Sequence, residues 1–260
     1  KKGNAVNLPV PARGAASAKA TNTAVTTILE SGNDVQLSLN QHWEYSRLIE
    51  DVVTIQANPT LRKFYTDDAG YALADAVDDY LFTAMRTLNG GGATASWTGA
   101  VIAGDGATLF VDASGAANST PITDAGIRRV IQTLDDNNMP MNGRFLVVPP
   151  VGRRVMMGLA RFTEQAFSGD GKAILNGKLG QVYGVSVHVS SNCPVPSAAT
   201  SARIGVLCHE DAVVLAEVSG PRVQTQYKQE YLATLLTADT IFGAIEVYDT
   251  GGLAIAMPGA

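Results

Sequence analysis

Histidine and cysteine, which most often bind metals or act as catalytic bases and nucleophiles, are few in this 260-residue chain: three histidines and two cysteines. Two histidines and both cysteines fall in one stretch, at His188, Cys193, Cys208 and His209. Their spacing contains neither a CxxC nor an HxxxH pair, so it does not match a compact zinc site. His188 falls on the polar parity of a predicted strand, and Cys208 ends an apolar one, where cysteine packs as a small core residue. We therefore predict no metal site and no cofactor.

Sequence patterns of catalytic sites are equally weak. The segment 169–172 (Gly-Asp-Gly-Lys) lacks the leading glycine and the Ser or Thr of a phosphate loop. The glycines at 90–92 have no strand before them and no helix directly after them, unlike a dinucleotide-binding turn. There is no GxSxG nucleophile elbow, and the third histidine, His42, lies in a predicted projecting strand. We predict that the chain is not an enzyme, and a hydrolase using His188 or His209 is the weakest alternative.

The composition of the chain excludes several classes of binding partner. The formal net charge is −5, which argues against tight, phosphate-driven binding of nucleic acid. Two cysteines do not form a disulfide framework, and no apolar run approaches membrane-spanning length. The first residues, Lys1 to Asn4, are not followed by the apolar core of a secretory signal. Since they also lack an initiator methionine, we expect the native chain to begin further upstream.

The elements that would position any site begin with an alternating stretch from Val35 to Ile49. Apolar residues fall mostly on one parity and polar residues on the other, which predicts one long strand with an apolar face. Such a strand would reach about 50 Å at 3.3 Å per residue, too long for the interior of a chain of this size. Its apolar face must therefore be covered by something else, most simply another copy of the chain.

A long helix is predicted to follow. Asn58-Pro59 is a typical start and Asn89 to Gly92 a typical stop. Between them an apolar stripe runs at helical spacing, through Leu73, Val77, Leu81, Ala84 and Leu88. Thr66 to Asp68 and Gly70 could divide this segment into a short lead-in and a long main helix.

The remaining elements alternate without a strict βαβ rhythm, which predicts an α+β fold. Residues 1–45 are interpreted as an extended β-loop. Helices are predicted from about Thr123 to Leu134 and around Val155 to Phe162. Strands are predicted over residues 107–111, 145–148, 182–189 (with Val185, Val187 and Val189 inward), 203–208, 213–218, 223–229 and 241–248.

In order, these elements resemble the major capsid proteins of tailed double-stranded DNA bacteriophages, particularly short-tailed ones, which share the Johnson fold (Hong Kong 97 type). The resemblance rests on motifs spread across nearly the whole chain. They are the extended loop running into Leu48 to Asp51 and Gln56; the helix around Tyr71 to Ala74 and Asp78; Leu134 to Pro140 followed by Arg144 and Leu146 to Pro150; the segment Gly180 to Asn192; and the return strands from Arg203 through His209 to Ala212 and on to Ile245.

The resemblance implies an E-loop at residues 1–45, a peripheral domain at 46–120 and 221–249, and an axial domain at 121–220 and 250–260. It implies hexamers and pentamers that build an icosahedral shell around double-stranded DNA, together with portal, scaffolding and possibly cement proteins, without membrane. The location implied is the virion capsid, assembled in the host cytoplasm. A bacterial nanocompartment shell, which uses the same fold around enzymes, remains the main alternative.

Residues at the base and in the body of the loop are the predicted inter-subunit contacts. Trp43 and Tyr45 are candidate aromatic anchors, because aromatic side chains dominate interface energies; they could equally pack on the long helix of their own chain. The predicted charged partners are Arg47, Glu50 and Asp51 at the loop base, and Arg13 and Lys19 within the loop.

Overall fold

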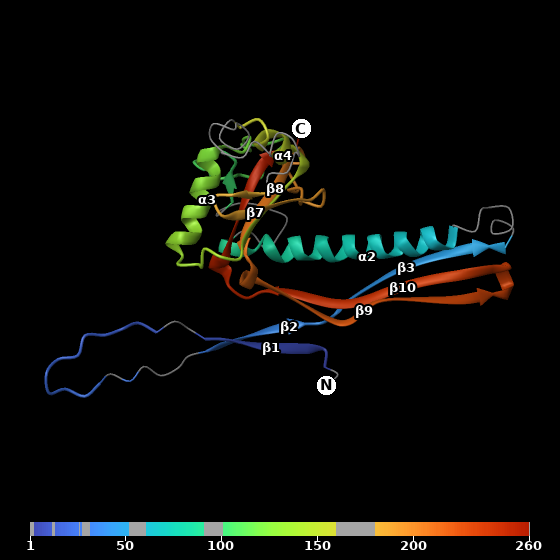
Figure 1. Cartoon of the computed structure of the whole chain (residues 1–260), viewed down its shortest axis with the longest axis horizontal. Coiled ribbons are helices and arrows are strands. Elements are labelled where there is room, and N and C mark those ends of the chain that lie inside the picture. The colour runs from blue at the N-terminus through green and yellow to red at the C-terminus, as the bar shows by residue number, and fades with distance from the viewer. Residues whose placement is uncertain are drawn as a thin grey trace.

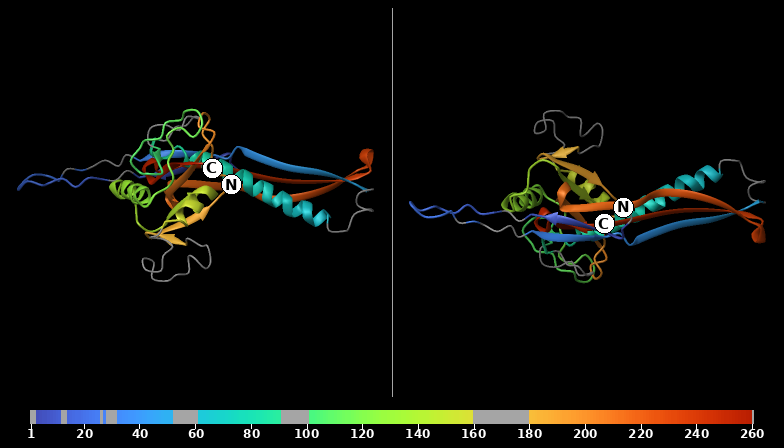
Figure 2. Two further views of the ribbon diagram at one scale, coloured as in Figure 1. Left: turned by 90° about the horizontal axis from the view of Figure 1, so that it is seen from above. Right: turned by 90° about the horizontal axis from the view of Figure 1, so that it is seen from below.

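Three parts make up the computed structural model: an extended hairpin, a long ribbon covered by a helix, and a body around a mixed sheet (Figure 1). The structure describes residues 3–11, 14–25, 27, 32–51, 61–90, 101–159 and 180–259. Figure 2 shows the hairpin and the ribbon projecting in opposite directions from the body. The molecule is therefore a long plate with a thicker middle.

The extended loop is the hairpin of β1 (Ala5–Val10) and β2 (Asn33–Ser38) with the residues between them. The two strands pair antiparallel, from Ala5 opposite Ser38 to Val10 opposite Asn33. Every described residue from 14 to 25 is exposed. The far part of the loop therefore finds no surface to pack against within its own chain.

The ribbon is a three-stranded sheet in the order β3-β10-β9. Its strands are β3 (Gln41–Glu50), β9 (Val213–Lys228) and β10 (Ala233–Glu246), with a one-turn helix η3 (Gln229–Tyr231) at the tip. Helix α2 (Leu61–Met85) lies along one face. Ala69 and Leu73 of α2 pack there against Leu236 and Ala238 of β10, so the helix and the ribbon form one stiff two-layer element.

The body is a six-stranded mixed sheet in the order β4-β11-β8-β5-β7-β6. Its strands are β4 (Ile102–Ala103), β5 (Arg144–Val148), β6 (Gln181–Val182), β7 (Val185–Val189), β8 (Ala202–His209) and β11 (Gly252–Pro258). The short helices η2 (Glu210–Ala212) and η4 (Asp249–Gly251) connect the body to the ribbon, between β8 and β9 and between β10 and β11, and η1 (Leu88–Gly90) follows α2.

The main core of the body lies between the sheet and two helices, α3 (Asp124–Asp136) and α4 (Pro150–Met156). Ile127, Val130 and Leu134 of α3 are buried there, as the helical spacing predicts. Phe82 and Leu88, from α2 and the turn after it, belong to a second buried cluster with Val206 and Cys208 of β8. The body is thus tied to the end of the long helix.

The predicted single strand from Val35 to Ile49 is wrong in one respect: it is two strands, interrupted at Leu39 and Asn40. The two halves have different partners, since β2 pairs with β1 and β3 pairs with β10. Only Leu37 and Ile49 of the apolar parity are fully buried. Local alternation could not show where one pairing partner replaced another.

The long helix does not divide at Thr66 to Gly70 but runs continuously from Leu61 to Met85. Its predicted start at Asn58-Pro59 lies outside the described residues. Leu73 and Leu88 of its predicted stripe are buried and the rest half-buried, with Ala69 and Phe82 buried as well. The helix at 155–162 instead begins at Pro150 and ends at Met156, and Phe162 also lies outside the described residues.

The strand predicted over residues 107–111 is wrong. The Asp105 carboxylate accepts hydrogen bonds from the backbone N–H groups of Ala107 and Thr108, which holds this segment in a turn. These bonds lower the pKa of Asp105, with the Thr108 backbone contributing most. Only Leu109 forms a bridge, to Ile102.

Other predicted strands differ in extent. The strand at 182–189 is divided into β6 and β7 by a turn with positive φ at Tyr183 and Gly184, and Val189 is exposed rather than inward. The strands at 213–218 and 223–229 are one bulged strand, β9. The strand at 241–248 is β10, which starts eight residues earlier, at Ala233. The strands at 145–148 and 203–208 are confirmed as β5 and β8, each one residue longer at its start.

Candidate assembly surfaces

The residues at the start of β3 link the extended loop to the ribbon. Trp43 pairs with Thr240 of β10, and its side chain stays 42% exposed. Tyr45 is half-buried in the cluster beneath α2. Its hydroxyl donates to Asp68 of α2 at 2.6 Å and accepts from Nε of Arg47 at 3.1 Å. Trp43 therefore keeps surface for a neighbour, whereas Tyr45 mostly fastens its own strand to its own helix.

Arg47 lies over aromatic rings on this same face. Its guanidinium carbon is 5.9 Å from the ring centre of Tyr45 and 5.7 Å from that of Tyr65, within the range of a cation–π contact. Burial, and then the hydrogen bond to Asp68, raise the pKa of Tyr45. The tyrosine stays protonated and able to donate at any physiological pH.

The far end of β3 carries the remaining charged candidates. Glu50 is exposed, and Asp51 accepts a 2.8 Å hydrogen bond from the hydroxyl of Tyr227 in β9. That bond raises the pKa of Tyr227. The backbone N–H of Asp51 also donates to the carbonyl of Leu232, at the tip of the ribbon. The candidates of β3 are thus spread along the ribbon instead of forming one patch.

Within the extended loop, Lys19 is exposed, whereas Arg13 lies outside the described residues. Helix α2 carries four exposed carboxylates on one side, those of Asp67, Asp75, Asp78 and Asp79. The carboxylate of Asp75 accepts a 2.6 Å hydrogen bond from Nδ2 of Asn192. Burial, and then the neighbouring charge of Asp75, raise the pKa of Asp78.

A charged cluster that the sequence did not predict crosses the middle of the ribbon. Nε and Nη2 of Arg222 donate to the two carboxylate oxygens of Asp239, each at 2.7 Å. Nε2 of His42 lies 3.2 Å from the same carboxylate. The Arg222 fork is the main cause that lowers the pKa of Asp239 to about 2. The three residues come from β9, β10 and β3, so this cluster joins all three strands beside the bulge of β9.

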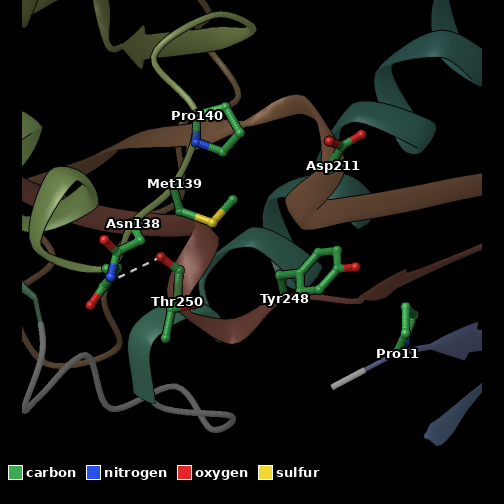
Figure 3. Close-up of a pocket in the computed structure, with 8 residues that line it drawn as sticks. Pro11, Asn138, Met139, Pro140, Asp211, Tyr248 and Thr250 are labelled. Atoms are coloured by element: carbon green, nitrogen blue, oxygen red, sulfur yellow. Dashed lines mark hydrogen bonds between the residues drawn. The ribbon is translucent and has the colours of Figure 1, made fainter. Parts of the chain in front are cut away.

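An open cavity of about 450 Å³ lies where the extended loop passes the body (Figure 3). Figure 3 shows Pro11 of the loop across the opening from the residues of the body. The other lining residues come from the end of α3 and from η2 and η4: Asn137, Asn138, Met139, Pro140, Asp211, Tyr248 and Thr250. The only carboxylate among these lining residues is that of Asp211.

The histidines occupy unrelated environments. His209 is buried, and its Nδ1 accepts the backbone N–H of Asp211 as the N-cap of η2. His188 is exposed and edge-on to the ring of Phe145. Cys193 and Cys208 are buried, and burial raises the pKa of each thiol to about 12. Across the described ranges, no three His, Cys, Asp or Glu side chains gather to hold a metal ion. The phosphate-loop-like segment at 169–172 lies outside those ranges.

No helix in the described part of the chain is long and apolar enough to cross a membrane.

Comparisons with known proteins agree on one family. The sequence profile of the phage capsid protein family matches residues 54–255, most of the chain. The fold is similar to a structure from Mycobacterium phage Che8, with a TM-score of 0.71 and 19% identity over 98% of this chain and 85% of that one. It is also similar to the capsid of cyanophage P-SCSP1u (TM-score 0.70, 17% identity, covering 100% and 85%). A third similar structure is the capsid of Ralstonia phage GP4 (0.69, 15%, covering 100% and 85%). A search of curated proteins finds no match.

Proposed function

We propose that this chain, which belongs to the phage capsid protein family, forms hexamers and pentamers that close into an icosahedral shell around double-stranded DNA. It is a structural major capsid protein with the Hong Kong 97-type fold, and its place is the multimeric shell of the virion. The family match favours this role over the nanocompartment shell and the hydrolase. The numbers of subunits per ring and the nature of the contents are the parts that we infer.

One observation carries the proposal: the extended loop projects from the body without a packing surface of its own. Val25 is 73% exposed, and every described residue from 14 to 25 is exposed. Ordering such a loop costs about 1–2 kcal/mol per residue in backbone entropy. A neighbouring subunit that receives the loop would repay that cost in every copy of a closed shell.

Charge supports the acidic side of α2 as the surface that receives the loop. The loop carries Lys19 and Arg13, and the exposed side of α2 carries the four aspartates named above. Two large apolar side chains, Phe64 and Tyr71, stand on this helix at 61% and 71% exposure. We infer that a neighbour's loop covers these rings while its basic residues meet the carboxylates. The partly exposed Trp43 and the charged Glu50 and Asp51 are further proposed contacts.

The domain division is also part of the proposal. The extended loop is one unit, α2 with the ribbon forms the peripheral domain, and the body forms the axial domain. Residues 101–120 join the axial domain in this division, because Val101 and Phe110 lie in a buried cluster with Ile204 of β8. Residues 213–220 join the peripheral domain, because they are the first part of β9.

The partners follow from this role. A portal protein, a scaffolding protein and possibly a cement protein would complete the particle, which we infer assembles in the host cytoplasm. The net charge of −5 fits a wall that contacts DNA non-specifically and weakly, since strong phosphate binding would hinder packing and release.

Electron microscopy of the purified protein tests the proposal. We expect closed icosahedral particles, or rings of five and six subunits. Particles taken from virions should contain double-stranded DNA. A monomeric protein recovered from virions would contradict the shell, and a cargo enzyme without DNA would replace it with the nanocompartment.

A further inference from the structure

The junction between the extended loop and the ribbon is unusually tight. Within β2 the side chain of Leu37 is 1% exposed, whereas its neighbours Gln36 and Ser38 are exposed. Strand β2 contacts β10 here in addition to its own partner β1. The backbone N–H of Leu39 donates to the carbonyl of Asn4 at 2.8 Å, which holds the other strand of the hairpin at the same level. The base of the loop is therefore seated on the ribbon, not joined to it by a free linker.

Gly243 of β10 forms the seat. A Cβ at this position would press into the carbonyl oxygen of Ser38, well inside any van der Waals distance, and would lie 3.1 Å from the carbonyl carbon of Ser38 and 3.3 Å from Cα of Leu39. Its φ is not positive, so glycine is required here for space alone. The atoms in the way belong to backbone, which cannot rotate aside as a side chain would.

We propose that the contact between Gly243 and Ser38 sets the direction in which the extended loop leaves the subunit, and that residue 243 thereby determines the geometry of the shell. This inference rests on the proposed function. It makes Gly243 a positioning residue: it would touch no neighbour itself, but it would decide where the loop meets one.

The length of the loop amplifies small changes at the seat. A methyl group on residue 243 must push Ser38 away by about 1 Å to reach an ordinary contact distance. The paired stem of β1 and β2 is six residues long, or about 20 Å, so this shift tilts it by about 3°. Lys19 lies up to about 60 Å along the chain from Ser38, and its position would move by up to about 3 Å.

The test compares Gly243→Ala with Gly220→Ala, a glycine of the neighbouring strand β9 with only Oε2 of Glu217, at 3.9 Å, near its would-be Cβ. Labels on Lys19→Cys and Gln132→Cys report the distance from the loop to α3 by double electron–electron resonance. The native thiols of Cys193 and Cys208 are buried, so only the introduced cysteines react. Electron microscopy of the same variants without labels reports the particles.

We expect Gly243→Ala to shift the mean distance by about 2–3 Å and to yield particles of altered size or none. Gly220→Ala should match the wild type in both measurements. A distance within 1 Å of wild type, with or without a change in the particles, would overturn the inference. Wild-type protein that is monomeric when recovered from virions would instead contradict the proposed function.

A second variant covers the case in which Gly243→Ala does not fold. Leu37→Ala removes the buried anchor of the loop base without adding an atom to the ribbon. We expect a distance distribution at least twice as wide as that of the wild type, because the stem can then rock on its seat. An unchanged width would show that this junction does not control the loop.

Discussion

The body and the ribbon both contain antiparallel strand pairs, yet β8 and β11 of the body are buried very differently from β9 of the ribbon. In β8 every residue but one is fully buried, and in β11 all but the last. In the 16-residue β9 of the ribbon no residue is fully buried. The difference arises because the body sheet packs against α3 and α4 in one buried cluster and against the end of α2 in a second cluster. The ribbon has a helix on one face only.

This contrast separates two kinds of stability. The body supplies the free energy that keeps one subunit folded. Under the proposed function, the ribbon and the extended loop expose surface that would be stabilised only when other subunits cover it. Substitutions in the body should therefore change the free energy of unfolding of the subunit, whereas substitutions in the ribbon or the extended loop should mainly change particle assembly.

The largest effect is expected from removing the extended loop. Replacing residues 11–32 by a two-residue turn should abolish particle formation, because the projecting contacts disappear. The free energy of unfolding of the subunit should change by no more than about 0.5 kcal/mol, as for surface changes generally. Electron microscopy and urea unfolding measure the two quantities. If the variant failed to fold, the prediction that the extended loop contributes to assembly and not to subunit stability would be wrong.

A core substitution should have the opposite signature. Leu146 of β5 is 2% exposed within the main core, and Leu146→Ala should lower the free energy of unfolding by about 2–5 kcal/mol. Urea unfolding of the isolated subunit measures this loss. The matched control is Leu48→Ala in the ribbon, where the side chain is 44% exposed and the loss should stay below about 1 kcal/mol. Equal losses would contradict the contrast.

A substitution at Trp43 tests whether a partly exposed side chain of the ribbon stabilises its own subunit or the assembled particle. Because its ring is 42% exposed, Trp43→Ala should cost the subunit only about 1–2 kcal/mol. It should weaken the shell more, since each copy loses an anchor. Comparing the denaturant midpoints of the subunit and of the particle separates these effects. A particle no more sensitive than the subunit would assign Trp43 to its own chain.

The smallest expected effect is on how the stability of the subunit depends on pH. The hydrogen bonds from Arg222 lower the pKa of Asp239 in the folded chain to about 2, from a usual value of 3.8. Its ionised form therefore adds stability that is complete above pH 4 and is lost as the pH falls through 2. Arg222→Gln should reduce the stability measured at neutral pH slightly, and the deficit relative to wild type should shrink between pH 4 and pH 2. Thermal unfolding at pH 2, 4 and 7 measures it, with Asp239→Asn as the control that removes the dependence.

Much of the local structure could be predicted from the sequence. The helical spacing of Ile127, Val130 and Leu134 identified α3, and Thr123 caps it by accepting from the backbone N–H of Gly126. The apolar run at 145–148 identified β5. These signals are local, because the residues that make the contacts are close together in the chain.

Some errors arise where contacts between distant segments decide the structure, whereas the turn at Asp105 and the undivided helix α2 are local features that the sequence patterns did not show. The first half of β10 was not predicted, and its Asp239 is paired with Arg222, seventeen residues away, and with His42, 197 residues away. The end of β2 could not be seen in the alternation from Val35 to Ile49, because only the change of partner from β1 to β10 marks it. No local pattern distinguishes Gly243 from the other glycines.

The sequence by itself determined that this chain has a strand region and a helix too long for a compact globule. It also determined an order of helices and strands that resembles the phage capsid family. It determined this because hydrophobic period and chain length are properties of neighbouring residues. The tertiary structure alone decided that Tyr45 is fastened to Asp68, that Asp239 joins three strands and that Gly243 seats the extended loop. These contacts depend on where separate strands meet, and that meeting is fixed by packing over the whole molecule.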